Sequence, residues 1–326
     1  MIENAVEKDW CVSMVLKALF QFSCADYLVF NGGTSISKGW SLIQSYSEDV
    51  DIAIDRSFFH FDGELSKKQR TQLRKASLKF IREELAVELD SILKGMGIND
   101  YSIVLPELIE SDKDPEIIFV PYNSVLEEAD ESLTNYIPFQ VKVEISCRSL
   151  REPCTQLMMR SLIAEEYPDE DFSEDYFGVN TVLPTRTFLE KAFLLHEEFQ
   201  KEDIRSLRMS RHLYDLEKLM DTPFATQALE DTELYTSIVK HRFAFTKWSG
   251  VDYTTHHPSA INFLPPEEVR EDWKKDYIEM QENFIYAESL SFEELLERMN
   301  ELLERFREVQ IDDDFFQSSE YNPQKR

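Results

Sequence analysis

Hydrophobic positions along the first 95 residues change from helical spacing to strand spacing and back. Apolar side chains recur every three or four residues over residues 9–23, which predicts a helix. Residues 27–33 form a short apolar run that ends in two glycines, and residues 49–55 alternate acidic and apolar positions, so both segments predict strands. Residues 33–43 favour a short helix between these strands, and residues 65–95 favour a long helix of mixed charge.

The rest of the chain divides into a strand-rich part and a helical part. Strands are expected at residues 101–105, 115–122, 137–146 and 155–165. From Pro184 onward the spacing becomes helical, and helices are expected at residues 187–200, 208–221, 232–246, 267–286 and 292–309. The pattern therefore predicts an α+β chain, with an α+β domain over residues 1–180, a helical domain over 181–310 and a polar tail over 311–326.

The charge balance narrows the classes of partner. The chain has 326 residues and carries 63 acidic against 35 basic side chains, a net charge of −28, which excludes histone-like or general DNA-coating roles. The basic residues gather on the helix expected over 65–95, chiefly Lys67, Lys68, Arg70, Arg74 and Lys75. This face is either a confined RNA contact or a solvated amphipathic helix. The charged N-terminus and the lack of a long apolar stretch predict a cytoplasmic protein with no membrane partner.

The first candidate for chemistry is a glycine pair. The chain has only 8 glycines, and Gly32 and Gly33 directly follow an apolar strand. Two glycines permit a tight turn with close backbone approach, and Thr34 and Ser35 can cap a helix whose N–H groups face a phosphate. An ordinary strand-to-helix turn is the alternative. Neither a P-loop nor a dinucleotide-binding fingerprint is present, because no GxxxxGK(S/T) occurs and no third glycine follows at the required spacing.

The second candidate is a pair of acids on the next strand. Asp49 and Asp51 flank Val50, so both carboxylates lie on one face of the strand while Val50 points into the core. Two carboxylates on one face suit Mg²⁺, which takes a few protein oxygens together with substrate phosphates. Glu144, which alternates with apolar residues in the segment 141–146, is the candidate third ligand. The alternatives are an exposed strand edge for the aspartates and a solvent-facing strand position for Glu144.

These segments resemble a known family. FNGGTSISKG at 30–39, SEDVDI at 47–52, TFLEKAFLLHE at 187–197 and RHLYDLEKL at 211–219 are similar to motifs of the AbiEii/MenT-type toxins, nucleotidyltransferases of bacterial type IV toxin–antitoxin systems within the polymerase-beta-like superfamily. The resemblance implies a nucleotidyltransferase-like N-terminal portion with a mixed sheet, followed by a helical portion that supplies further site residues. Family members often carry an arginine where this chain has Ser45.

The resemblance also implies roles for individual residues. Catalysis would involve Asp49, Asp51, Lys191 and Asp215, and Mg²⁺ or Mn²⁺ would be held by Asp49 and Asp51, with Glu144 as the third candidate. The nucleotide would be bound by Gly32, Gly33, Thr34, Ser35, Lys38, Ser47 and Lys191. From the residues alone, Lys191 borders the apolar stripe of its helix and could be a snorkelling lysine. Asp215, four residues after Arg211, could form a surface ion pair.

The function that these features favour is metal-dependent nucleotidyl transfer. A nucleoside monophosphate would pass from an NTP to an acceptor hydroxyl, with pyrophosphate leaving. The family implies the tRNA 3′ end as acceptor, a role as toxin in a toxin–antitoxin or phage-defence system, and a cognate antitoxin as partner. Two alternatives are a nucleotidyltransferase that acts on a protein or a small molecule, and a nucleotide-binding protein of the same fold without turnover.

Overall fold

The computed structural model describes residues 3–46, 49–126, 138–147, 153–246, 248–311 and 316. The chain forms two compact units, the first comprising residues 1–41 and 46–182 and the second comprising 42–45 and 183–326. The mixture of helices with a six-stranded sheet confirms the α+β fold class. Ser47, one of the expected nucleotide-binding residues, lies outside the described residues.

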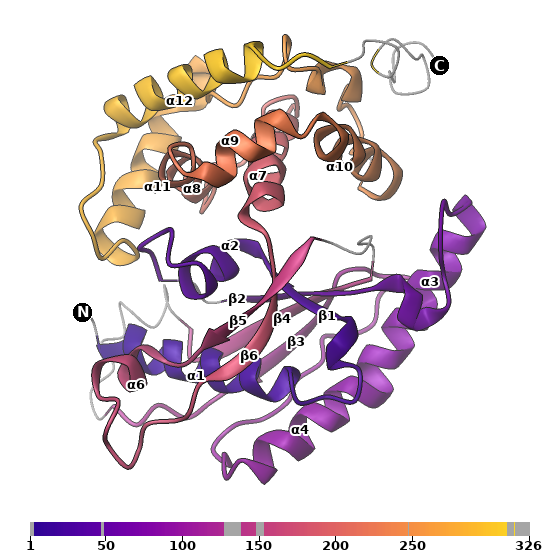
Figure 1. Ribbon diagram of the computed structural model, residues 1–326, viewed down its shortest axis with the longest axis vertical. Coiled ribbons are helices and arrows are strands. Elements are labelled where there is room, and N and C mark those ends of the chain that lie inside the picture. Colours follow the sequence, from indigo (N-terminus) through magenta and orange to yellow (C-terminus); the bar gives the residue numbers. More distant parts are fainter. Residues whose placement is uncertain are drawn as a thin grey trace. The chain divides into compact units, whose positions relative to one another are not determined.

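The first unit is built on a mixed sheet (Figure 1). Its strands are β1 (Leu28–Asn31), β2 (Asp49–Ile54), β3 (Glu116–Pro121), β4 (Gln140–Ser146), β5 (Cys154–Met159) and β6 (Phe177–Val182), in the order β3-β4-β2-β1-β6-β5. β2 runs parallel to β4 and β1 parallel to β6, whereas β1–β2, β3–β4 and β5–β6 are antiparallel. The two acid-bearing strands, β2 and β4, are therefore direct neighbours.

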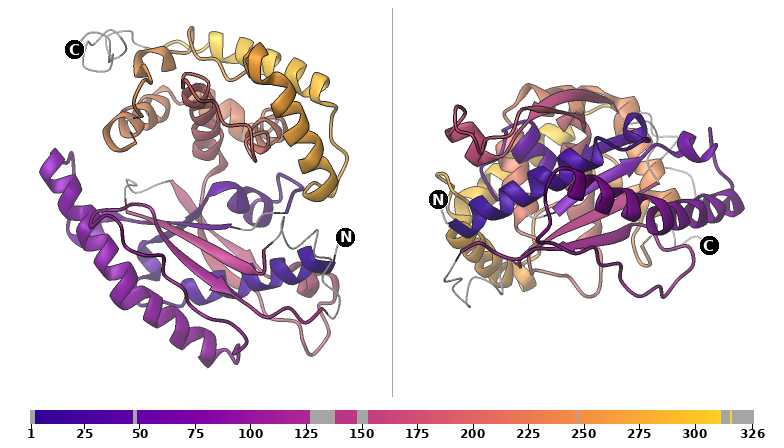
Figure 2. Two further views of the ribbon diagram at one scale, coloured as in Figure 1. Left: turned by 180° about the vertical axis from the view of Figure 1, so that it is seen from behind. Right: turned by 90° about the horizontal axis from the view of Figure 1, so that it is seen from below.

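One face of this sheet is covered by helices of the same unit. α1 (Glu3–Leu19) contacts β2, β4 and β6 and packs against α4 (Ala86–Gly95), and both helices cross the sheet in the view from below (Figure 2). A π-helical turn joins α4 to α3 (Lys67–Phe80). Apolar side chains of β2 and β4, such as Val50 and Val143, point into this core, because alternate residues of a strand face opposite sides. Alternation thus directs Asp49 and Asp51 to the other face.

Two short helices complete the first unit. The strand β1 runs directly into a helical turn formed by α2 (Gly32–Thr34) and the π-helical segment Ser35–Gly39. α6 (Leu162–Glu166) starts at Ser161, whose hydroxyl accepts a hydrogen bond from the Ala164 N–H. This cap explains why the strand expected over 155–165 ends early, at Met159.

The second unit is helical. Its helices are α7 (Pro184–Glu198), α8 (Arg211–Leu219), α9 (Pro223–Glu230), α10 (Thr232–Phe245), α11 (Arg270–Asn283) and α12 (Phe292–Arg307). α7 contacts α8, α9 and α10, and almost all of its side chains are buried. Residues 42–45 also belong to this unit, since Ser45 forms a β-bridge with Ile285.

Several boundaries differ from the sequence expectations. β6 and α9 were not expected, and residues 101–105 form no strand but only two isolated bridges, Tyr101 with Tyr122 and Val104 with Phe119. The apolar run at 101–105 predicts a strand, but the segment pairs at only these two isolated positions and so stays outside the sheet. α9 is a short helix that starts on a proline, and such a helix leaves little periodic signal. Among the described residues, no helix is both long and apolar enough to cross a bilayer.

Candidate active site

The turn between β1 and α2 is shaped by Gly32. Its φ angle is +75°, in the left-handed region that glycine adopts readily. A Cβ atom at this position would lie 1.9 Å from Asp51 Oδ2, so no side chain fits there. The Asp51 carboxylate therefore packs directly against the backbone of the turn. In the sequence, the glycine pair and the acid pair are related only by their proximity along the chain, whereas the structure brings Gly32 into contact with Asp51.

The hydroxyl and lysine side chains that follow Gly33 hold this turn in place. Thr34 Oγ1 donates a hydrogen bond to the Asp49 carbonyl oxygen, and Ser35 Oγ donates to the Gly32 carbonyl oxygen at 2.9 Å. Both side chains are buried. Lys38 Nζ forms an ion pair of 2.7 Å with Asp9 Oδ1 on α1. Thr34, Ser35 and Lys38 thus anchor the turn to β2, to its own backbone and to α1, and nucleotide contact by them stays a prediction.

Asp49 and Asp51 lie on one face of β2, as the alternation predicts. The register pairs Asp51 with Glu144 on β4 and with Asn31 on β1. It also pairs Asp49 with Lys142. Because paired residues of neighbouring strands project to the same side of a sheet, these five polar side chains form one patch. We call Asn31, Asp49, Asp51, Lys142 and Glu144 the polar face.

Lys142 holds a central position on the polar face. Its ammonium nitrogen donates a hydrogen bond to Glu144 Oε1 and lies 3.8 Å from Asp49 Oδ2. Burial acts to lower the pKa of Lys142, but the hydrogen bond to Glu144 and the charges of Asp49 and Asp51 outweigh it, so the net pKa lies above its ordinary value. Lys142 is therefore a cation at neutral pH.

Some of the side chains of the polar face are suitable ligands for a hard divalent cation. Asp49 and Asp51 offer carboxylate oxygens from one strand face, and Mg²⁺ is often held by one or two carboxylates together with substrate phosphates. Glu144 lies on the neighbouring strand, as a third ligand would require, but its carboxylate binds Lys142. Within the part of the chain that the structure describes, no three acidic, histidine or cysteine side chains come together as a ligand cluster. Asp49 and Asp51 are the two carboxylates whose placement on one strand face would suit such a cation.

In the second unit, Lys191 and Asp215 meet. Lys191 Nζ on α7 lies 2.5 Å from Asp215 Oδ2 on α8, and the two side chains are only 8% and 5% exposed. The sequence alternatives, a snorkelling lysine and a surface pair of Asp215 with Arg211, both place these groups in solvent. The structure instead shows a buried ion pair between these two residues, which are 24 positions apart in the chain. His212 on α8 is buried, and within the described part of the chain its Nδ1 has no hydrogen-bond partner. Burial, together with the charge of Lys191, lowers the pKa of His212 well below its ordinary value.

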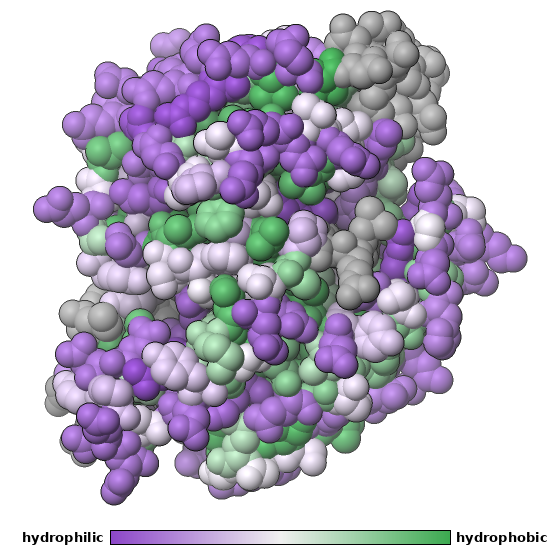
Figure 3. All heavy atoms as spheres, viewed as in Figure 1, coloured by the Kyte–Doolittle hydropathy of each residue, from purple (hydrophilic) through white to green (hydrophobic). Residues whose placement is uncertain are grey.

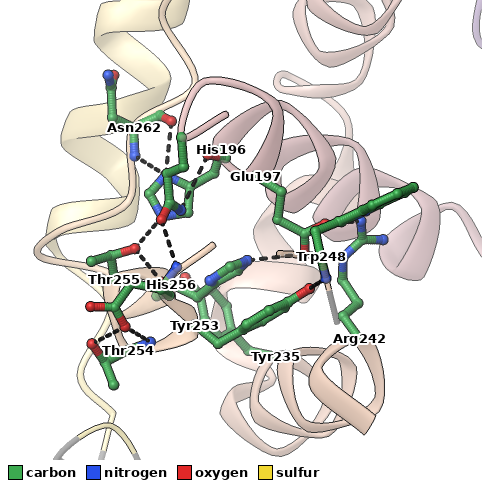
Figure 4. Close-up of polar contacts among 12 residues, drawn as sticks. His196, Glu197, Tyr235, Arg242, Trp248, Tyr253, Thr254, Thr255, His256 and Asn262 are labelled. Carbon is green, nitrogen blue, oxygen red and sulfur yellow. Dashed lines mark hydrogen bonds and ion pairs between the residues drawn. The ribbon is translucent and has the colours of Figure 1, made fainter. Parts of the chain in front are cut away.

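A second buried polar cluster ties α7 to α10 and to the segment 253–262 (Figure 4). Arg242 donates two hydrogen bonds to the Glu197 carboxylate, at 2.6 and 2.7 Å, and His256 Nε2 lies 3.2 Å from Glu197 Oε1. His196 contacts the Thr255 hydroxyl at 2.8 Å. Although burial acts to raise the pKa of Glu197, Arg242 and His256 lower it to about 2. Each charged group in this cluster has a partner, so it serves to fasten the helices together.

Sequence analysis missed Lys142. The strand pattern that singled out Glu144 also places Lys142 on the same face, since Val141, Val143 and Ile145 all point into the core. The signal was therefore present, but a lysine two residues from a glutamate is common on exposed strands. Only the pairing of β4 with β2 shows that Lys142 stands opposite Asp49.

The chain thus combines a mixed sheet, two aspartates on one strand face, a glycine turn packed against Asp51, and a helical unit. The profile of the family described as "Nucleotidyl transferase AbiEii toxin, Type IV TA system" matches residues 15–298. The chain belongs to this family, and it is a nucleotidyltransferase toxin of a type IV toxin–antitoxin system.

A solved structure supports the same fold. The chain is similar to MenT4, a nucleotidyltransferase toxin from Mycobacterium tuberculosis H37Rv, with a TM-score of 0.58 and 15% sequence identity. The alignment covers 96% of this chain and 87% of the MenT4 chain. None of the curated protein sequences matches this chain. The AbiEii/MenT-type resemblance in the motifs is thereby confirmed at the level of family and fold.

Proposed function

We propose that this toxin is metal-dependent and transfers a nucleoside monophosphate from an NTP to the 3′ end of tRNA, which blocks translation. The close packing of Asp51 against Gly32 carries the catalytic part of the proposal. It joins a backbone turn suited to phosphate with a carboxylate suited to Mg²⁺ or Mn²⁺.

In this reaction the acceptor oxygen attacks the α-phosphorus, and the bond to the bridging oxygen of pyrophosphate breaks. The turn at Gly32 and Gly33 would position the triphosphate, and Asp49 and Asp51 would hold the metal. When bound, Mg²⁺ neutralises charge that develops on the phosphates. Lys191 pairs with phosphate, and Asp215 orients the acceptor hydroxyl or takes its proton. The protein therefore contributes mainly position and charge neutralisation.

The choice of RNA as acceptor is supported by the basic face of α3. Lys67, Lys68 and Lys75 are exposed, and the projecting end of α3 is a hydrophilic surface in Figure 3. A protein with a net charge of −28 needs such a local basic surface to approach a polyanion. A role in phage defence and inhibition by a cognate antitoxin belong to the same proposal.

Incorporation of labelled nucleotide tests the proposal. The full-length protein is incubated with Mg²⁺, total tRNA and each of the four α-labelled NTPs, and the label is followed into RNA, protein and small molecules. We expect label in tRNA, lost at least 1,000-fold in Asp51→Asn and on removal of metal with a chelator. Label in protein or metabolites instead would favour the alternative acceptors.

A matched variant separates chemistry from folding. Asp55→Asn alters another acid just beyond β2, whose side chain caps a short 3₁₀ helix, and we expect it to retain incorporation. Nucleotide binding by calorimetry without any pyrophosphate release would contradict the catalytic proposal and favour a binding protein. If Asp51 and Asp215 serve one reaction, the losses in kcat/KM of their Asn variants will not add in the double variant.

A further inference from the structure

We propose that Lys142 is a counter-ion within the polar face, held by Glu144, that competes with the divalent cation for Asp49. The inference rests on the proposed function, because it concerns the metal that Asp49 and Asp51 would hold. It assigns to Lys142 a positioning role that weakens metal binding by the protein alone.

The geometry of the strands places Lys142 where a competitor must be. It stands opposite Asp49 in the β2–β4 register, and its ammonium nitrogen lies 3.8 Å from Asp49 Oδ2 and within hydrogen-bond contact of Glu144. Glu144 in turn stands opposite Asp51. A lysine in this position therefore bridges the two strands that bear the acids.

The charges explain why a cation is needed there. Glu144 stands opposite Asp51, and Asp49 lies on the same face two residues before Asp51, so three carboxylates repel one another; like charges opposite each other destabilise a sheet. One ammonium group offsets part of this repulsion. A divalent cation would offset it more fully, but it must first displace Lys142 from Asp49. The side chains of Asp49, Lys142 and Glu144 are 25–30% exposed, so solvent screening keeps the competition moderate.

The competition has a functional consequence. Without nucleotide, metal binding would break the ion pair between Lys142 and Asp49, and no other anion would replace Asp49 beside the Lys142 ammonium group. A bound triphosphate supplies such an anion close to the polar face. Metal and nucleotide would then favour each other's binding, which is a positive thermodynamic coupling.

Titration with Mn²⁺ alone tests the proposal on the full-length protein. The Kd is measured from the electron paramagnetic resonance signal of free Mn²⁺ in wild type, Lys142→Met and Lys142→Arg. We expect Lys142→Met to bind Mn²⁺ about 10-fold more tightly, since the competing charge is gone, and Lys142→Arg to stay within about 3-fold of wild type. Lys94→Met, which removes an exposed lysine of the same unit, is the control for net charge and should leave the Kd unchanged.

A second measurement follows folding. The melting temperature of Lys142→Met in metal-free buffer should fall below that of wild type, and the difference should disappear with saturating Mn²⁺. An unchanged or weaker Mn²⁺ affinity in Lys142→Met would overturn the counter-ion role and leave the metal site intact. Absence of Mn²⁺ binding in every variant, or binding unaffected by Asp51→Asn, would overturn it together with the metal site of the proposed function.

Discussion

At the scale of single residues, Gly32 shows how two constraints can act on one position. A positive φ disfavours any L side chain, at a cost of about 1 kcal/mol. The Asp51 carboxylate adds a steric constraint, because an ideal Cβ would overlap it. The first constraint affects folding, and the second affects the placement of an acid that the reaction needs.

We expect Gly32→Ala to lose nucleotide incorporation at least 100-fold, since the added methyl group must displace Asp51. Gly97→Ala is the matched control, because Gly97 has a φ of +84° with open space around it. Both variants should lose stability in urea unfolding from the positive φ, and Gly32→Ala should lose more, because its methyl group also overlaps Asp51. Full activity in Gly32→Ala would show that the contact with Asp51 has no part in catalysis.

At the scale of elements, two pairs of segments bring charged groups together. β2 and β4 align their acids and Lys142 through parallel pairing, and α7 and α8 bring Lys191 to Asp215. The second pair is buried, and removing one partner of a buried ion pair leaves an uncompensated charge that costs about 3–5 kcal/mol. A loss of activity in a single variant could therefore reflect unfolding rather than chemistry.

A double variant that removes both charges separates a loss of folding stability from a loss of catalysis. Asp215→Asn should lower the free energy of unfolding by about 3 kcal/mol or more, whereas the double variant Lys191→Met with Asp215→Leu should regain most of it. We expect the double variant to remain inactive, because it lacks the groups proposed to contact phosphate and acceptor. Glu293→Ala, which breaks the exposed pair with Lys274, should leave the free energy of unfolding nearly unchanged, because solvent screens exposed ion pairs. An active double variant would show that the pair is structural only.

The buried cluster between α7 and α10 predicts a dependence of stability on pH. Burial lowers the pKa of His196 to about 3, and it also lowers the pKa of His256. The unfolded chain takes up protons on these histidines near pH 6.5, whereas the folded chain does not. The stability contributed by His196 is therefore fully present above pH 6.5 and is lost as the pH falls from 6.5 toward 3, by about 1.4 kcal/mol per pH unit, and His256 adds a loss in the same direction.

Urea unfolding between pH 8 and pH 5 measures this slope. His196→Gln should reduce it by about 1.4 kcal/mol per pH unit below pH 6. His60→Asn removes an exposed histidine with a positive φ, which asparagine tolerates, and should leave the slope unchanged. Equal slopes in wild type and His196→Gln would contradict the assignment.

At the scale of the whole molecule, the net charge of −28 opposes contact with RNA, so binding must depend on a local surface. The exposed lysines of α3 supply it in the proposed function. Counterion release makes such binding sensitive to salt.

We expect the double variant Lys67→Ala with Lys75→Ala to weaken tRNA binding at 100 mM salt. The slope of log K against log salt should become shallower by about 1–2, as the loss of two phosphate contacts implies. Lys94→Ala with Lys275→Ala, two exposed lysines away from α3, is the control of equal charge change. Filter binding over 50–200 mM salt gives the slopes, and identical slopes for the two double variants would contradict the assigned surface.

The sequence by itself determined which residue types stand where and at what period. Alternation placed Asp49 and Asp51 on one face of a strand and Glu144 on one face of another, because a strand's side chains must alternate. Helical spacing found most of the helices after Pro184, and the motifs led to the correct family. The short helix α9 was missed, and so was β6, although residues of β6 alternate between buried and partly exposed positions.

Only the tertiary structure decided which of these faces meet. Strand order put β4 beside β2 and so set Lys142 opposite Asp49, and helix packing turned Asp215 toward Lys191 rather than toward Arg211. The contact of Gly32 with Asp51 likewise depends on the antiparallel pairing of β1 and β2. Periodicity is a local property of the backbone, whereas register and packing depend on residues far apart in the chain, and local patterns do not encode them.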